Sequence, residues 1–69
     1  MSVYKVIDII GTSPDSWEKA AAAAVEMASK TLSDLRVAEV KDLDLQIENG
    51  RILNYRVKLA VSFKYHEEM

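Results

Sequence analysis

The sequence is short of the residues that usually hold small proteins together. Among its 69 residues there is no cysteine, so disulfides and thiolate zinc sites are excluded. A single domain of this size buries only about 60% of the surface that its unfolded chain exposes, which leaves it marginally stable. Small domains offset that deficit with disulfides, a metal or association between subunits. Composition therefore favours an oligomer of one domain, residues 1–69.

Charge and hydropathy argue against two classes of partner, nucleic acids and membranes. Nine basic residues against eleven acidic ones give a net charge of −2, whereas nucleic-acid binding needs a basic surface. No apolar run approaches the roughly 20 residues of a membrane span, and the first residues do not have the layout of a signal peptide. We therefore expect no nucleic-acid partner, no membrane partner and a cytoplasmic location.

Local patterns predict three strands. β-branched and aromatic residues favour a strand over Val3–Ile10, which Gly11 ends. Arg36–Glu48 alternates polar and apolar residues along its second half, as a strand with one dry face does. Asn49-Gly50 then predicts a type I′ hairpin that pairs this strand antiparallel with Arg51–Tyr65. One face of the last strand is apolar: Leu53, Tyr55, Val57, Leu59, Val61, Phe63 and Tyr65.

A helix is predicted between the first and second strands. Thr12–Asp15 is typical of a helix start, with Ser13 as the cap, Pro14 at the first helical position and Ser16 as the alternative cap. The helix is expected to run to about Ser33. Its apolar stripe, mostly alanine, would let a sheet approach closely: Trp17, Ala21, Ala24, Ala28, Leu32 and Leu35.

The length of the last strand bears on assembly. Its 15 residues would span about 50 Å, whereas a globule of this chain length has a radius of gyration near 11 Å and a diameter of roughly 28 Å. The strand must therefore bend around the helix or extend onto neighbouring subunits. One helix also cannot cover both the hairpin and the first strand, so we predict sheets shared between subunits.

Nucleophilic catalysis finds no support in the sequence, and we predict that the protein is not an enzyme. His66 is the only histidine and lies in a polar tail, where exposure to solvent is the simpler interpretation. Thr12-Ser13 could bind an anion at a helix start, but capping explains these residues more simply. Other serines have no predicted base beside them: Ser16, Ser29, Ser33 and Ser62.

Three carboxylates, Asp42, Asp44 and Glu48, share one face of the second predicted strand. Calcium prefers several oxygen ligands, which clustered carboxylates supply. The spacing lacks the glycine and the twelfth-position glutamate of an EF-hand loop, so a solvated acidic face is the simpler interpretation for one chain. A carboxylate near a rotation axis is repeated by its neighbours, however, so an assembly can build a site that one chain cannot.

Two other features each have two interpretations. Trp17 could stack on a ligand, but its helical spacing with the alanines favours a place in the core. Arg56-x-Lys58, on the polar face of the last strand, could meet an anionic ligand or face solvent.

The chain resembles the dodecin family over nearly its whole length. The motifs that carry the resemblance are Val3–Pro14, which contains Gly-Thr-Ser before the helix, then Trp17-Glu18, Ala28–Leu32, Asn49-Gly50 and Tyr55-Arg56-Val57. The resemblance implies an α+β fold, in which a β-α-β-β subunit wraps a three-stranded antiparallel sheet around one helix. It also implies a hollow shell of twelve subunits that binds and stores flavin (riboflavin or FMN) between paired tryptophans.

The chain departs from the flavin-binding pattern at two positions. By the resemblance, the stacking tryptophan falls at Val37 and the glutamine that reads the flavin edge falls at Arg56. Valine offers no aromatic face, and stacking contributes about 0.5–1.5 kcal/mol beyond area burial. Arginine does not reproduce the donor and acceptor of an amide. These substitutions argue against ordinary flavin stacking.

The sequence resembles instead a tryptophan-lacking dodecin branch that includes calcium-binding members. Asp42, Asp15 and Asp44 are the candidate metal ligands that this resemblance suggests, because dodecins place ions along symmetry axes. Two hypotheses follow. The protein is a binding shell whose flavin site is degraded, or it is a shell that binds calcium or another divalent cation or serves a purely structural purpose. Flavin sequestration by a modified site is the remaining alternative.

Overall fold

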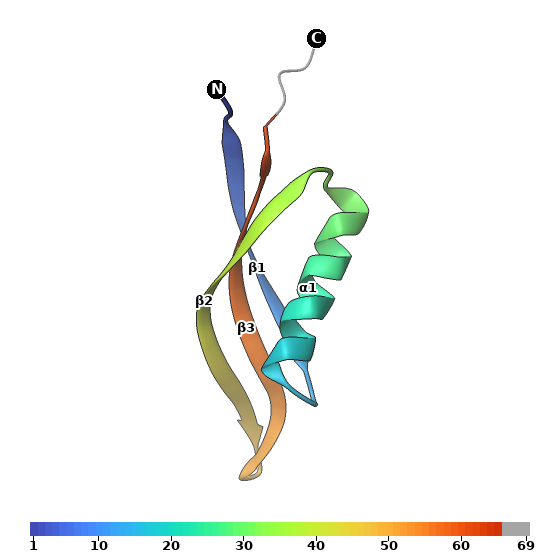
Figure 1. Ribbon diagram of the computed structural model, residues 1–69. Helices are drawn as coiled ribbons and strands as arrows, with labels where there is room; N and C mark the ends of the chain where they lie inside the picture. Colours follow the sequence, from blue (N-terminus) through green and yellow to red (C-terminus); the bar gives the residue numbers. More distant parts are fainter. Residues whose placement is uncertain (66–69) are drawn as a thin grey trace.

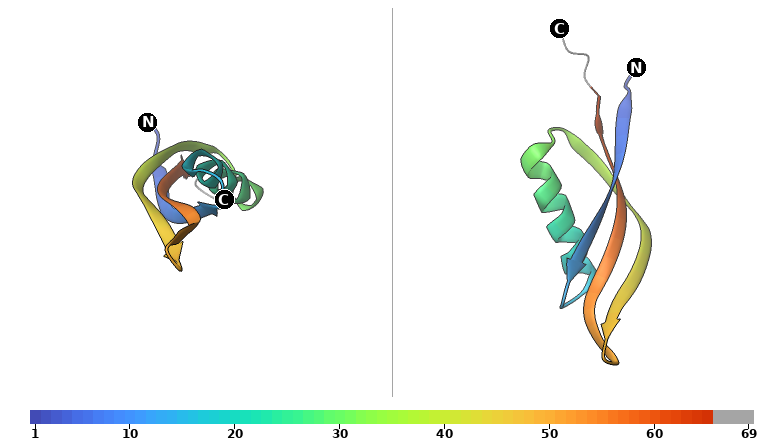
Figure 2. Two further views of the ribbon diagram at one scale, coloured as in Figure 1. Left: turned by 90° about the horizontal axis from the view of Figure 1, so that it is seen from below. Right: turned by 180° about the vertical axis from the view of Figure 1, so that it is seen from behind.

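The computed structural model describes residues 1–65, and the predicted His66 tail lies outside them. Its elements are β1 (Tyr4–Ser13), α1 (Trp17–Thr31), β2 (Leu35–Glu48) and β3 (Arg51–Lys64). The strands form one antiparallel sheet in the order β1-β3-β2, which curves around α1 (Figure 1 and the end-on view of Figure 2). The predicted fold class, an α+β subunit with a three-stranded antiparallel sheet wrapped around one helix, is confirmed.

The sequence predicts that Gly11 ends the first strand, and this prediction is wrong. β1 continues through it to Ser13, where it still pairs with Tyr55 of β3. Gly11 is instead the point where α1 lies closest to the sheet: a Cβ at this position would overlap the carbonyl oxygen of Ala20 and lie 2.9 Å from the Cβ of Ala24. Glycine is therefore needed here for close approach between helix and strand.

Ser16, the alternative cap, begins the helix, and the prediction that Ser13 caps it is wrong. The Ser16 hydroxyl accepts a hydrogen bond from the Lys19 N–H at 3.0 Å. Ser13 closes the turn before it, because its hydroxyl accepts from the N–H groups of Asp15 at 3.0 Å and Ser16 at 3.5 Å. Pro14 consequently lies in this turn rather than in the helix. At the other end α1 stops at Thr31, two residues before the expected Ser33.

The core lies where α1 covers β1 and β3. Val57, Leu59 and Val61 of β3 are each only 1% exposed, and they pack against the buried alanines of α1. The predicted alanine stripe is confirmed at Ala24 and Ala28. The helix is rotated slightly from that prediction, since the fully buried position is Ala20, one residue before the expected Ala21.

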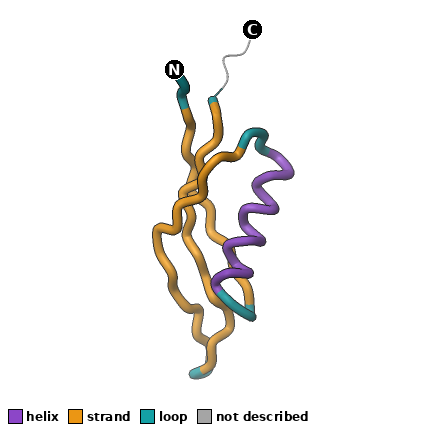
Figure 3. Tube along the Cα trace, viewed as in Figure 1, coloured by secondary structure: helices purple, strands orange, loops and turns teal. Residues whose placement is uncertain are grey.

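The helix does not cover β2. Every residue of β2 after Leu35 is exposed within the single subunit. The β2–β3 hairpin turns at Asn49 and Gly50, whose φ angles of 52° and 74° match the predicted type I′ turn. The hairpin projects past the first turn of α1, and the N-terminus and the end of β3 lie at the opposite end (Figure 3 and the rear view of Figure 2).

The subunit is consequently elongated. Its principal extents are 53 × 20 × 15 Å and its radius of gyration is 14.2 Å, above the 11 Å or so expected of a globule. The strands both curve around the helix and extend beyond it. Within residues 1–65, the only helix is neither long nor apolar enough to cross a membrane.

Candidate functional site

The two faces of the sheet differ in character. Side chains alternate across a strand, so the residues between the buried Val57, Leu59 and Val61 point away from α1. We call the side turned away from α1 the outer face. Strand register places on it, from β2 and β3, the residues Val37, Glu39, Asp42, Asp44, Gln46, Asn54, Arg56, Lys58, Ala60 and Ser62. Four of the five site residues predicted from the sequence, Val37, Asp42, Asp44 and Arg56, therefore lie on this one face. The fifth, Asp15, does not.

Arg56 and Asp44 form a two-point ion pair across β3 and β2. Arg56 donates from Nε to Oδ1 at 2.7 Å and from Nη2 to Oδ2 at 3.3 Å. The hydrogen bond from Arg56 holds the pKa of Asp44 below its ordinary value of 3.8, and the same bond raises the pKa of Arg56. Paired geometry of this kind suits the planar fork of a guanidinium. Both groups therefore stay charged over a wider pH range than when isolated.

Trp17, on the side of the sheet that faces α1, holds the backbone of β2 at Asp44. Its indole Nε1–H donates to the carbonyl oxygen of Asp44 at 3.2 Å, and its ring meets Tyr55 edge to face with centroids 5.2 Å apart. Trp17 also packs, half-buried, against the core. These contacts confirm the prediction that Trp17 belongs to the core, and they join the start of α1 to β2.

Val37 and Arg56, the two positions of the family's flavin site, do not meet within one subunit. Val37 is 61% exposed and lies opposite Ser62, whose hydroxyl donates to the Val37 carbonyl at 3.3 Å. Arg56 is six residues away along β3, a distance of about 20 Å in a strand. Any site that contains both positions must therefore draw them from different subunits.

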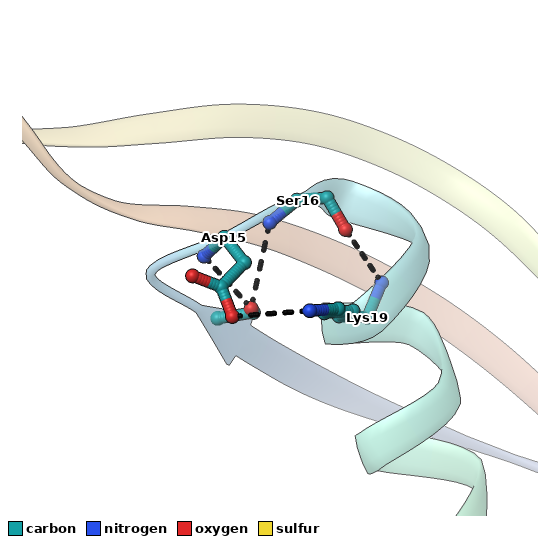
Figure 4. A network of polar contacts seen from close by, with 4 residues as sticks. Asp15, Ser16 and Lys19 are labelled. Atoms are coloured by element: carbon teal, nitrogen blue, oxygen red, sulfur yellow. Dashed lines mark hydrogen bonds and ion pairs between the residues drawn. The ribbon is translucent and has the colours of Figure 1, made fainter.

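The structure does not bring the three candidate metal ligands together. Asp44 is paired with Arg56, and Asp15 is paired with Lys19 at 3.3 Å in the turn that leads into α1 (Figure 4). Asp42 lies opposite Lys58 in the register. Within residues 1–65, no three histidine or acidic side chains come close enough to hold a metal ion. One subunit by itself therefore does not fit a calcium ion.

Apolar grooves flank α1 on both sides, and sequence reasoning missed them. A groove of about 430 Å³ lies between α1 and β1. A second, of about 330 Å³, lies between α1 and β2, and it is lined by Trp17, Glu18, Ala21, Val40, Leu43 and Val57. The signal available in the sequence was the run of alanines, whose short side chains leave room beside a helix.

The ion pair of Arg56 and Asp44 was also missed. A hairpin without irregularities around Asn49-Gly50 would place Asp44 opposite Tyr55, with Arg56 on the other face. The register shifts between Gln46 and Ile47, so that Leu53 has no partner on β2 and Asp44 meets Arg56. An extra residue of this kind is a β-bulge, and no local signal at Leu53 predicts it.

These features define a class of protein: a small β-α-β-β subunit whose long, curved sheet is only partly covered by its helix. The family model described as Dodecin matches residues 3–66. The chain is 58% identical over 64 residues to calcium dodecin of Mycobacterium tuberculosis, covering 93% of this chain and 90% of that protein. It is 38% identical over 65 residues to dodecin of Thermus thermophilus, covering 94% of each. The chain belongs to the dodecin family.

Solved structures agree. The dodecin of Streptomyces coelicolor superposes with a TM-score of 0.92 at 37% identity, over 97% of this chain and 96% of that one. The calcium dodecin of M. tuberculosis, described as a calcium-chelating antigen with a novel calcium-binding site, superposes with a TM-score of 0.85 at 55% identity, over 99% and 97%. The resemblance to the dodecin family predicted from the sequence, and in particular to calcium dodecins, is confirmed.

Proposed function

We propose that the protein is a binding and storage protein, not an enzyme, and that twelve copies of its single domain, residues 1–69, form a hollow shell. The proposal further holds that the flavin site of this shell is degraded. The observation that carries it is the state of β2, which is exposed along nearly its whole length in one subunit. A cytoplasmic location remains the expectation from the sequence.

The exposed residues of β2 support assembly because many of them are large and apolar. Val40, Leu43 and Ile47 are 52%, 53% and 64% exposed, and Val40 and Leu43 line the groove between α1 and β2. Exposed apolar side chains that gather on one strand mark an interaction surface more often than a solvent-facing one. A domain of 69 residues buries too little surface by itself to be more than marginally stable. Burying this surface against other copies would add to its free energy of unfolding.

The degraded flavin site is supported by the side chains at the two substituted positions. Val37 presents an exposed aliphatic side chain where an aromatic face would be needed. Arg56 already uses Nε and Nη2 on Asp44, so these donors are not available to a ligand, and a guanidinium has no acceptor atom. Neither residue can repeat the contacts that the family makes with a flavin ring.

Native mass spectrometry combined with riboflavin titration tests this proposal. We expect a twelve-subunit mass and little quenching of riboflavin fluorescence.

The double variant Val37→Trp/Arg56→Gln is expected to bind riboflavin at least tenfold more tightly than the wild type, since it regains both the aromatic face and the amide. Val37→Leu/Arg56→Gln is the matched control without the aromatic ring. Saturating submicromolar quenching by the wild type would reject the degraded site and favour a modified flavin site. A monomeric mass would reject the shell.

Calcium binding is the second candidate function, favoured by the 58% identity to calcium dodecin. Because one subunit does not assemble three carboxylates, we propose that any such site is completed by symmetry, with Asp42, Asp15 or Asp44 contributed by several copies. Millimolar calcium is then expected to raise the melting temperature of protein first treated with a chelator, because ligands that bind only the folded state stabilise it. Magnesium is the control. An unchanged melting temperature would reject the calcium site.

A further inference from the structure

The carboxylate of Asp44 is the candidate calcium ligand whose surroundings the structure defines most fully. Both of its oxygens accept hydrogen bonds from Arg56, at 2.7 and 3.3 Å. Its backbone is held by the indole of Trp17. Arg56 lies on the central strand, between Thr12 of β1 and Asp44 of β2. Both side chains are exposed, at 41% and 55%, but the two nitrogens of Arg56 fix the orientation of the carboxylate, and Trp17 anchors the strand that carries it.

We infer that Arg56 is a specificity-determining residue that acts as a built-in cation and withholds Asp44 from divalent ions. The inference rests on the calcium alternative proposed above and refines it by removing one of its three candidate ligands. A hard cation such as calcium needs carboxylate oxygens with free lone pairs and a site of net negative charge. Arg56 takes one lone pair on each oxygen of Asp44 and cancels the negative charge that would attract the cation.

The contrast with Asp42 shows why the effect belongs to Arg56 and not to positive charge in general. Lys58 lies opposite Asp42, as Arg56 lies opposite Asp44. No ion pair joins Asp42 to Lys58 within residues 1–65, whereas Arg56 reaches Asp44 with two nitrogens. Lys58→Gln is therefore a matched control: it removes the same charge from the same face of the same strand, two residues from Arg56.

Terbium luminescence provides the test, because Tb³⁺ uses the same oxygen ligands as calcium and is excited by a nearby tryptophan. Trp17 is the only tryptophan of the chain, and its indole lies 3.2 Å from the Asp44 carbonyl oxygen. We expect Arg56→Gln to tighten Tb³⁺ binding by about fivefold or more, because the positive charge of Arg56 no longer repels a Tb³⁺ ion a few ångströms away. The sensitised emission of the assembled protein measures this affinity. Lys58→Gln is expected to change it less than twofold by the same measure.

Two further variants identify the ligand. Asp44→Asn in the Arg56→Gln background is expected to abolish the gain. In the otherwise wild-type protein, Asp44→Asn is expected to change Tb³⁺ affinity no more than Glu39→Gln does, which removes another carboxylate from the outer face of β2. This second comparison does not depend on how well Arg56→Gln folds.

Three results would overturn the inference. They are an Arg56→Gln protein that binds Tb³⁺ no better than the wild type, an equal gain in Lys58→Gln, or a wild-type protein that loses its affinity on Asp44→Asn alone. None of them bears on the shell, which the native mass reports separately. An absent calcium effect on melting, conversely, would reject the calcium function while the Arg56→Gln gain could still be observed.

Discussion

Replacing Gly11 with alanine is expected to destabilise the protein strongly, although the change adds only one methyl group. The added Cβ would overlap the carbonyl oxygen of Ala20 and lie 2.9 Å from the Cβ of Ala24. The overlap involves helix backbone, so α1 must move away from β1 and loosen the core. We expect a loss of more than about 3 kcal/mol in the free energy of unfolding, which corresponds to a fall of roughly 12 °C or more in melting temperature.

Gly50→Ala is the matched control for this prediction. Gly50 has a φ of +74°, but a Cβ there would meet nothing within 4 Å. Only the cost of a left-handed alanine applies, about 1 kcal/mol. Thermal melts of both variants at one fixed subunit concentration separate the two effects. Equal losses would show that close approach of α1 is not what requires glycine at position 11.

Leu43→Asp is expected to dissociate the proposed shell while leaving the subunit fold in place. Leu43 is 53% exposed in the single subunit, where a polar side chain would be tolerated within about 0.5 kcal/mol. It also lines the groove between α1 and β2. If another copy covers this groove, each aspartate becomes a buried, unpaired charge that costs several kcal/mol, and the cost is repeated in every subunit.

Native mass spectrometry and far-ultraviolet circular dichroism measure the two parts of this expectation. A mass shift from twelve subunits toward one, with the strand and helix signal retained, is the expected result. Ala23→Asp provides the control, since it places the same side chain on the exposed side of α1 near Lys19. A Leu43→Asp protein that stays fully assembled would show that β2 is not covered in the shell.

Much of the fold could be predicted from local patterns. The alternation in β2 and β3 and the Asn49-Gly50 turn predicted the hairpin and its turn type, because these signals act between neighbours in the chain. The ends of elements were less accurate. Local patterns indicate a strand end at Gly11 and a helix cap at Ser13, whereas pairing with β3 extends the strand over both residues.

The candidate site was predictable only in part. Val37 and Arg56 were identified by resemblance, and the structure places both on the outer face of the sheet. Their separation along the sheet, with Val37 opposite Ser62 and Arg56 opposite Asp44, and the absence of a metal cluster within residues 1–65 were not evident from the sequence. Sites that one chain does not complete leave no local spacing signal, because their other ligands come from copies of the same residues.

The sequence by itself determined the family, the order of elements, the long hairpin and the substitutions at Val37 and Arg56. The tertiary structure alone decided which side chains meet. The extra residue at Leu53 shifts the register by one. A shift of one residue exchanges the face on which each pair of side chains meets, and here it holds as far as the next shift, between Val40 and Asp42. The shift at Leu53 places Arg56 opposite Asp44. Register is a property of the paired strands, so neither strand encodes this contact alone.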